Sequence, residues 1–304
     1  MCSGIMLVLL AMSLTPGLDA ISKELGQTHD PFFVVFARYA AAGLIALIIA
    51  GITGEEIALD VKSLPGQLLR AGLMMGAMCA FVTALTMVPL ADAVGGFLIA
   101  PIVATGLSVV LLGERMSRQK IIGALLSLLG AVLILRPGLN SQAGTLFALG
   151  GGVLLGCYFT ASRGTGRREG VVSALAVQSL LGSAMVAPMA LSNGVPMIDI
   201  EVFGWILALG IVSALTHVMM IMAFRLAEAS VLAPFMYFNL VVAVALGIVL
   251  FGEVPEAMTL AGLGAILFGG LTTAVRPQVL TRLLGALPGR LAAPVQPAPI
   301  GVAA

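Results

Sequence analysis

Long apolar runs alternate with short polar breaks along almost the whole chain. A helix needs roughly 17 to 25 mostly apolar residues to cross the hydrocarbon of a bilayer. Ten runs meet this length, at residues 4–22, 32–51, 68–87, 92–112, 119–136, 144–162, 171–191, 203–223, 229–251 and 257–275. A transmembrane β-barrel would instead show alternating segments of about ten residues. The pattern therefore predicts an all-α polytopic membrane protein with ten transmembrane helices.

The composition strengthens this interpretation. Hydrophobic residues make up 60% of the chain and charged residues only 10%, whereas soluble domains carry about 25% charged residues. The net charge is +1, so a nucleic-acid partner is not expected. The sequence shows no cluster of His, Cys or acidic residues at metal-ligand spacing and no nucleotide-binding loop. We therefore predict no catalytic residues, no metal and no cofactor, and contacts with membrane lipids.

The positive charges are unevenly divided between the two sides of the predicted bundle. With the N-terminus in the cytoplasm, twelve of the 15 Lys and Arg residues fall on the cytoplasmic side. Only Lys23 and Arg136 fall outside, and Arg38 lies within the second run. Since cytoplasmic loops of membrane proteins are enriched in Lys and Arg, we expect both termini to be cytoplasmic.

The two halves of the chain share a sequence pattern. VVLLGERM at 109–116 matches IVLFGEVP at 248–255, which places Glu114 against Glu253 at a spacing of 139 residues. We interpret both glutamates as structural residues that satisfy helix ends and pair with nearby cations, such as Arg115 for Glu114. A role as gates is the alternative.

This spacing divides the chain into three parts. Residues 1–138 are predicted to form a first five-helix repeat, residues 139–277 a second, and residues 278–304 a disordered, Pro- and Ala-rich cytoplasmic tail. Because each repeat has an odd number of helices, the second must be inverted relative to the first. Inverted repeats occur in many secondary transporters, where they enclose a site near the bilayer midplane.

Three charged residues lie within or just after the first two apolar runs. Asp19 and Arg38 lie at similar depths below the same face, and Lys23 follows Asp19 by one helical turn. A carboxylate inside a membrane needs a partner, so we expect Asp19 to pair with Arg38 and Lys23 to share the carboxylate. The pair is either a structural salt bridge or a site for a polar substrate group or a coupled proton. The positions 140 residues later, Phe159 and Gln178, carry no charge, which favours the functional interpretation.

Further polar side chains within the runs could line a pathway through the bundle. His217 could relay protons or form a hydrogen bond between helices. The others offer hydrogen-bond donors and acceptors to a cavity: Tyr39, Tyr158, Gln178, Tyr237 and Asn239. Pro101 and Pro234 interrupt the fourth and ninth runs, so a cavity or a neighbouring helix must satisfy the backbone groups that they free.

Small residues recur four positions apart in two of the runs. Gly72 and Gly76 form one such pair, and Gly152 and Gly156 form the other. This spacing allows helices to approach closely. We expect the close packing inside the bundle, with a homodimer face as the alternative.

The duplicated halves and the Gly-Glu pairs that close runs four and nine resemble the EamA-type family of the drug/metabolite transporter superfamily. The resemblance covers about residues 4–277 and includes Arg38 in FFVVFARYAAAG and the segment LAPFMYFNLVVAVALGIVLFGE at 232–253. It implies a secondary transporter of the bacterial inner membrane that moves a small-molecule substrate by alternating access.

A shorter match suggests a substrate. D-A-I-S-K at 19–23 is similar to a pattern at the end of the first span of some EamA-type carriers, and the family includes riboflavin importers. We therefore predict riboflavin uptake, with amino-acid or other metabolite export as the alternative within the family. A membrane-embedded lipid-modifying enzyme is an alternative of a different class, and it would need the catalytic cluster that the sequence lacks.

Overall fold

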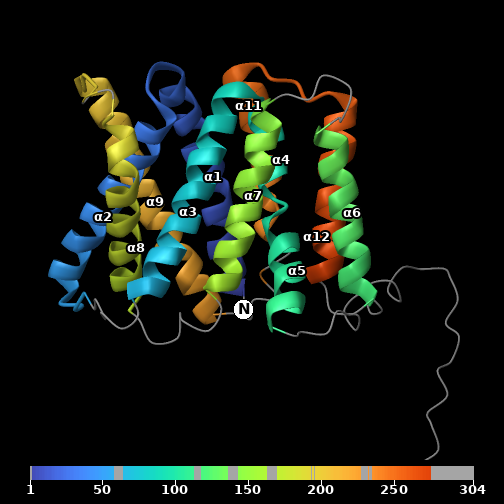
Figure 1. Cartoon of the computed structure of the whole chain (residues 1–304), viewed down its shortest axis with the longest axis horizontal. Coiled ribbons are helices and arrows are strands. Elements are labelled where there is room, and N and C mark those ends of the chain that lie inside the picture. The colour runs from blue at the N-terminus through green and yellow to red at the C-terminus, as the bar shows by residue number, and fades with distance from the viewer. Residues whose placement is uncertain are drawn as a thin grey trace, which may run out of the picture.

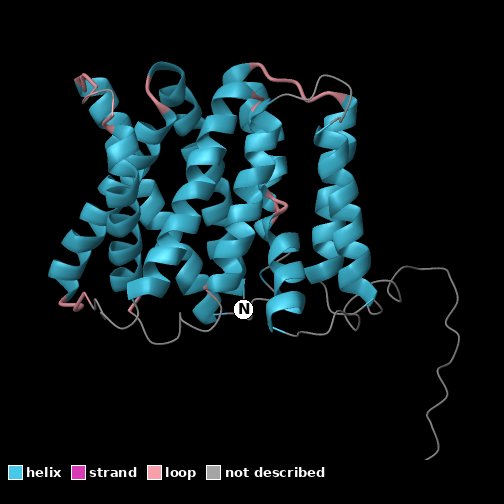
Figure 2. Cartoon of the chain, in the orientation of Figure 1, coloured by secondary structure: helices cyan, strands magenta, loops and turns pink. Residues whose placement is uncertain are grey.

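The computed structural model describes residues 2–57, 64–112, 118–135, 143–162, 170–192, 194, 196–226, 232 and 235–274. Within these ranges all regular structure is helical, as Figure 2 shows. The helices are α1 (Cys2–Thr28), α2 (Pro31–Thr53), α3 (Leu64–Met87), α4 (Leu90–Phe97), α5 (Ala100–Leu112), α6 (Arg118–Leu135), α7 (Ala143–Ala161), α8 (Val171–Ala190), α9 (Ile200–Leu226), α11 (Phe238–Phe251) and α12 (Ala257–Ala274). The predicted tail at 278–304, Glu114 and Pro234 lie outside the described residues.

The helices have the length and composition of membrane spans. Seven segments are long and apolar enough to cross a bilayer, counting α4 and α5 together as one. Three further helices are apolar but shorter, at Ile121–Ile134, Phe238–Phe251 and Ala257–Thr272. All these segments coincide with the predicted runs, so the prediction of an all-helical, polytopic membrane protein is confirmed.

The helices stand side by side, and the N-terminus and the end of α12 lie at the same face of the bundle (Figure 1). Local chemistry sets several helix ends. The Asp30 side chain accepts a hydrogen bond from Phe32 N at 2.8 Å, and Pro31 occupies the first turn of α2, where its missing N–H costs nothing. At the other end of α2, Gly54 adopts a φ of 70°, the left-handed conformation that commonly ends helices.

Helix α1 is longer than its predicted run, which ended at residue 22. The helix continues to Thr28 and so includes Lys23 and Glu24. Lys23 is buried, whereas Glu24 is exposed. A buried lysine can remain inside the helix because it has partners from two other helices, described below.

Pairs of helices from the two halves pack against each other throughout the bundle. The most extensive contacts join α6 with α12, α2 with α8, α3 with α7, and α1 with α9. Figure 1 shows α6 and α12 side by side at one end of the bundle, and α2 and α8 at the other. Each of these pairs joins a helix from residues 1–138 to one from residues 139–277.

The α6–α12 contact is close because glycines face backbone on the opposite helix. A Cβ added to Gly130 would lie 2.5 Å from the carbonyl oxygen of Gly262. A Cβ added to Gly269 would lie 2.5 Å from the carbonyl oxygen of Gly123. Between these two contacts, the Ser127 hydroxyl donates to the Ile266 carbonyl at 3.4 Å. Close backbone approach of this kind is a usual means of helix association in membranes.

The glycines spaced four apart in α3 and α7 also face helices of the same chain. A Cβ on Gly72 would meet Met185 of α8, and one on Gly76 would meet Leu154 of α7. Cβ atoms on Gly152 and Gly156 would meet the backbone of the α4–α5 region. The close packing predicted for these residues is therefore internal.

The fourth span is interrupted, and this break shapes the interior. Helix α4 ends at Phe97 and α5 begins at Ala100, so that Leu98 and Ile99 form a short turn at membrane depth. Pro101 lies in the first turn of α5, where the missing N–H is tolerated. The interruption predicted from Pro101 is thus present. Non-helical backbone at this depth is tolerated where it is buried in protein or lines a cavity.

Candidate functional site

A cavity of about 510 Å³ lies inside the bundle. Its walls come from both halves of the chain: α1 to α3 and the α4–α5 break from the first, and α7, α8, α9, the start of α11 and α12 from the second. Volumes of 300–1,000 Å³ are typical of small-molecule sites, which combine apolar walls with a few polar groups. This cavity fits that description in both size and position.

The lining is mostly apolar, with polar side chains at a few positions. Methionines and aromatic residues, including Met12, Met74, Met78 and Phe97, form much of the wall. Methionine side chains adapt to irregular shapes. The polar side chains come from six helices: Thr15 from α1, Arg38 and Tyr39 from α2, Thr105 from α5, Gln178 and Ser179 from α8, Ser213, Thr216 and His217 from α9, and Asn239 from α11.

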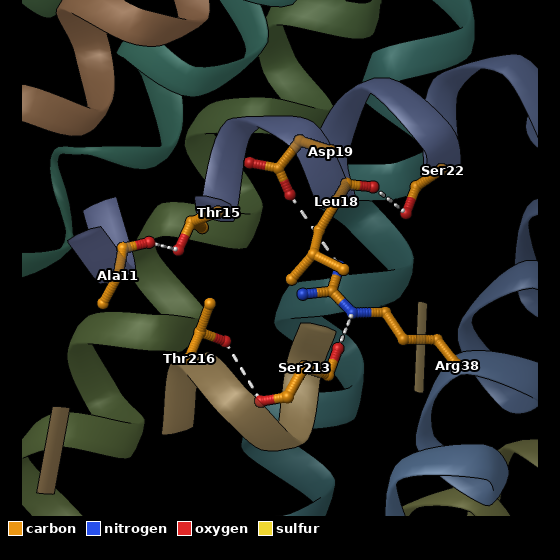
Figure 3. Close-up of polar contacts among 8 residues, drawn as sticks. All are labelled: Ala11, Thr15, Leu18, Asp19, Ser22, Arg38, Ser213 and Thr216. Atoms are coloured by element: carbon orange, nitrogen blue, oxygen red, sulfur yellow. Dashed lines mark hydrogen bonds and ion pairs between the residues drawn. The ribbon is translucent and has the colours of Figure 1, made fainter. Parts of the chain in front are cut away.

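The structure brings Asp19 and Arg38 together, as Figure 3 shows, and Arg38 lines the cavity. Arg38 Nη1 lies 3.8 Å from Asp19 Oδ1, and the two side chains are only 11% and 6% exposed. Arg38 Nε donates to Ser213 Oγ at 3.1 Å. This second bond fixes the guanidinium against α9, so one side chain joins helices from both halves of the chain.

Helix α1 contains a proline three residues before Asp19. Pro16 lies inside the helix and cannot donate to the carbonyl of Met12, one turn earlier. The hydroxyl of the preceding residue, Thr15, donates to Ala11 O at 2.9 Å. Both Met12 and Thr15 line the cavity, so this part of α1 forms part of its wall.

The other predicted pathway residues lie in or next to the same cavity. Tyr39, Gln178, His217, Tyr237 and Asn239 all line it. Tyr158 is absent from the lining but donates from its hydroxyl to Gln178 Oε1 at 2.9 Å, so it acts on the cavity through Gln178.

Tyr237 and Asn239 lie at the beginning of α11, which starts inside the bundle. Tyr237 precedes the first helical residue and packs against Gly270 of α12, where any Cβ would overlap its ring. Asn239 follows in the first turn, and its buried Oδ1 has no hydrogen-bond partner among the described residues. The start of α11 thus lines the cavity together with the α4–α5 break.

Lys23 does not share the Asp19 carboxylate, and that expectation was wrong. Its ammonium binds Glu253 Oε1 at 2.5 Å and donates to Val88 O at 2.9 Å. Glu253 also accepts from Leu90 N, at the start of α4, at 2.8 Å. Glu253 therefore satisfies a helix end and pairs with a cation, the kind of contact expected of it. Asp19 is left with Arg38 because Lys23 is engaged by these stronger contacts at the end of the bundle.

Sequence reasoning missed Ser213 and Thr216, which neighbour His217 on α9. Their hydroxyls look unremarkable in an apolar run, since Ser and Thr often bond to their own helix, as Thr216 does to Ser213 O at 3.0 Å. The available signal was the spacing of Ser213 and His217, four residues apart, which places both on one face of α9. Within the described residues, no group of three or more His, Cys, Asp or Glu side chains could hold a metal ion.

The fold and this cavity define a polytopic membrane protein with an internal small-molecule site built from both halves of the chain. A model of the EamA-like transporter family matches residues 2–136 and 142–274. The chain belongs to this family and is a membrane transporter rather than an enzyme. The family suggested by the Gly-Glu pairs and by the segment around Arg38 is therefore confirmed.

Named relatives are transporters of different compounds. The pseudopaline exporter CntI of Pseudomonas aeruginosa is 30% identical over 86% of this chain and 92% of its own length. An S-adenosylmethionine uptake transporter of Rickettsia prowazekii is 22% identical over 86% of this chain and 88% of its own. A crystal structure with 19% sequence identity matches 94% of this chain and 99% of that chain with a TM-score of 0.64. This last likeness shows the fold alone.

Proposed function

We propose that the protein is a secondary transporter that moves a small metabolite across the bacterial inner membrane by alternating access. The cavity is the observation that carries this proposal. It is lined by both halves of the chain, at the break between α4 and α5 and beside a buried ion pair. Interrupted helices that place polar backbone near a midplane site are a feature of secondary transporters.

The proposal includes two inverted repeats, at residues 1–138 and 139–277. The α6–α12 contact supports them. At a spacing of 139 residues Gly130 corresponds to Gly269 and Gly123 to Gly262, so the contact between Gly130 and Gly262 corresponds to the contact between Gly269 and Gly123. Ser127 corresponds to Ile266, the residue to which it donates a hydrogen bond. Such reciprocal contacts are expected of two units related by a two-fold axis.

We place both termini in the cytoplasm. The asymmetry of Lys and Arg supports this orientation, and so does the position of the N-terminus and the end of α12 at one face. Riboflavin uptake, predicted from the D-A-I-S-K match, finds no support in the names of the relatives. Since one relative is named as an exporter and another as an uptake transporter, the proposal is limited to a small metabolite.

The experiment compares metabolites inside and outside bacteria that lack or overproduce the protein. We expect at least one small metabolite to change its distribution with the wild-type chain. Asp19→Asn should abolish that change, because it leaves the Arg38 guanidinium without a counter-ion beside an apolar cavity. Glu24→Gln is the matched control: the same chemical change at an exposed position of the same helix should retain wild-type transport.

Membrane abundance of each variant is measured in the same cells. A riboflavin auxotroph and an amino-acid efflux strain, tested alongside, separate the two substrates considered from the sequence. Unaltered metabolite distributions with the wild-type chain would contradict transport through this cavity. Full transport by Asp19→Asn would remove Asp19 from the mechanism.

A further inference from the structure

Two polar side chains that line the cavity end in buried atoms without a hydrogen bond. Arg38 Nη1 is a donor, and Asn239 Oδ1 is an acceptor, and neither has a partner among the described residues. Buried polar atoms are nearly always paired in native proteins, so each exception calls for an explanation. Both residues line the same cavity, which suggests that a ligand supplies the missing partners.

Asp19 neutralises the charge of Arg38, but Arg38 Nη1 has no hydrogen-bond partner among the described residues. The 3.8 Å between its Nη1 and Asp19 Oδ1 exceeds the 2.7–3.2 Å of a hydrogen bond. Ser213 holds Nε at 3.1 Å and so fixes the plane of the guanidinium. An oriented guanidinium with free donors is suited to a planar anion, which it can bind through two parallel N–H groups.

The charge of the cavity limits the ligand to one negative group. Among the described residues that line it, Arg38 is the only Lys or Arg, and there is no Asp or Glu. A single cation in a mostly apolar wall can neutralise a monoanion such as a carboxylate. A doubly charged phosphate would retain an uncompensated charge, which is costly in such surroundings.

We propose that the transported substrate carries a carboxylate and an N–H or O–H donor on a largely apolar body. The carboxylate replaces Asp19 as the partner of Arg38, the displaced Asp19 takes up a proton so that one anion still faces one cation, and Asn239 Oδ1 accepts the hydrogen bond from the donor. This inference rests on the proposed function, because it assigns the substrate class of the same cavity. Asp19 is then the counter-ion of the empty transporter and competes with the substrate for Arg38.

Three probes of equal size test the assignment on the purified, full-length protein in detergent. N-benzoyl-L-leucine has both groups, its carboxamide lacks the carboxylate, and its oxygen analogue replaces the amide N–H with an ester oxygen. We expect the acid to bind about 10- to 100-fold more tightly than the carboxamide, the loss typical of one hydrogen bond to a charged group. The oxygen analogue should bind several-fold more weakly than the acid.

Variants separate the two contacts. Asp19→Asn with Arg38→Gln removes both charges together, which avoids a buried unpaired charge, and should abolish the preference for the acid over the carboxamide. Asn239→Leu should abolish only the preference for N–H over the ester oxygen. Asp19→Asn alone should tighten binding of the acid, about tenfold, because the competing carboxylate is gone. Arg118→Gln, an arginine change at an exposed position, should leave all three affinities as in the wild type.

Equal binding of acid and carboxamide by the wild-type protein would overturn the proposal. So would a preference for the acid that survives in the double variant, since that preference would not come from Arg38. If no probe binds while the metabolite experiment succeeds, the substrate class is wrong and the transport function stands. If both experiments fail, the proposed function fails with it.

Discussion

The contact between Lys23 and Glu253 supports a quantitative prediction about stability. Glu253 joins three elements: it binds the Lys23 ammonium of α1 through Oε1 and the Leu90 N–H of α4 through Oε2, and it follows Gly252, the residue that caps α11. Lys23 also donates to Val88 O and lies 5.2 Å from the centre of the Phe251 ring. The substitution Glu253→Gln keeps the shape and one acceptor but removes the charge that neutralises Lys23.

The expected loss of unfolding free energy on Glu253→Gln follows from the burial of the Lys23–Glu253 ion pair. The Lys23 and Glu253 side chains are 9% and 21% exposed, so the ammonium would remain almost fully inside the protein with one carbonyl as its partner. Removing one member of a buried ion pair costs about 3–5 kcal/mol. Because some water reaches Glu253, we expect the lower end, about 3 kcal/mol of unfolding free energy. That change is roughly a hundredfold in the unfolding equilibrium.

The assay is unfolding of the purified protein by titration with SDS in mixed micelles, followed by circular dichroism. Glu253→Gln and Lys23→Met should each lower the free energy of unfolding. The double variant should be more stable than the sum of the two losses implies, because no buried charge is left unpaired. Glu24→Gln, next to Lys23 but exposed, is the control and should change stability by less than about 0.5 kcal/mol.

Two outcomes would refute this reasoning. If Glu253→Gln is no less stable than Glu24→Gln, the ion pair does not hold α1 to the region between α11 and α12. If the two single losses add without coupling in the double variant, the residues contribute independently and the contact is not the source of the stability.

Two further predictions concern packing and capping. Gly130→Leu should separate α6 from α12 and lower the free energy of unfolding by at least about 2 kcal/mol, as overpacking does. Gly264→Ala is the control, because a Cβ there would meet nothing within 4 Å, and it should be neutral or stabilising. The same SDS titration compares the two variants, and equal stability would contradict the close contact between α6 and α12. Glu55 Oε1 accepts hydrogen bonds from Val172 N and Ser173 N and so caps the start of α8. Glu55→Ala should therefore lower the free energy of unfolding by about 1 kcal/mol and speed hydrogen exchange at those two amides. Exposed Glu56→Ala should change neither, and unchanged exchange in Glu55→Ala would exclude the cap.

The helical architecture was predictable because each span is specified locally. Uniformly apolar stretches of about 20 residues can be read without knowledge of any contact, and the described helices fall on the predicted runs. The break in the fourth span was also visible, since Pro101 lacks an N–H wherever it packs. The end of α1 could not be predicted from the sequence. Lys23 can lie buried in the helix because it pairs with Glu253, which is 230 residues away.

The candidate site was only partly predictable for the same reason. Unusual residues in apolar runs identified Asp19, Arg38, His217 and Asn239, since a polar group inside a membrane is noticeable in the sequence itself. Their partners were not identified. Sequence spacing assigned Lys23 to Asp19 because the two are one turn apart, whereas the fold offers Lys23 a carboxylate and a carbonyl from other helices.

The two halves of the chain differ at the position of the Asp19–Arg38 ion pair, and this difference bears on the role of the pair. At the 140-residue spacing Asp19 corresponds to Phe159 and Arg38 to Gln178, so neither charge is repeated in the second half. Gln178 is hydrogen-bonded to Tyr158, the residue before Phe159, at 2.9 Å, so the second half has a polar contact next to the corresponding place but without charge. A contact needed only to join two helices is satisfied by the neutral version, which avoids the cost of burying ions. The charged version in the first half therefore needs another reason, and an anion that binds Arg38 in place of Asp19 supplies one.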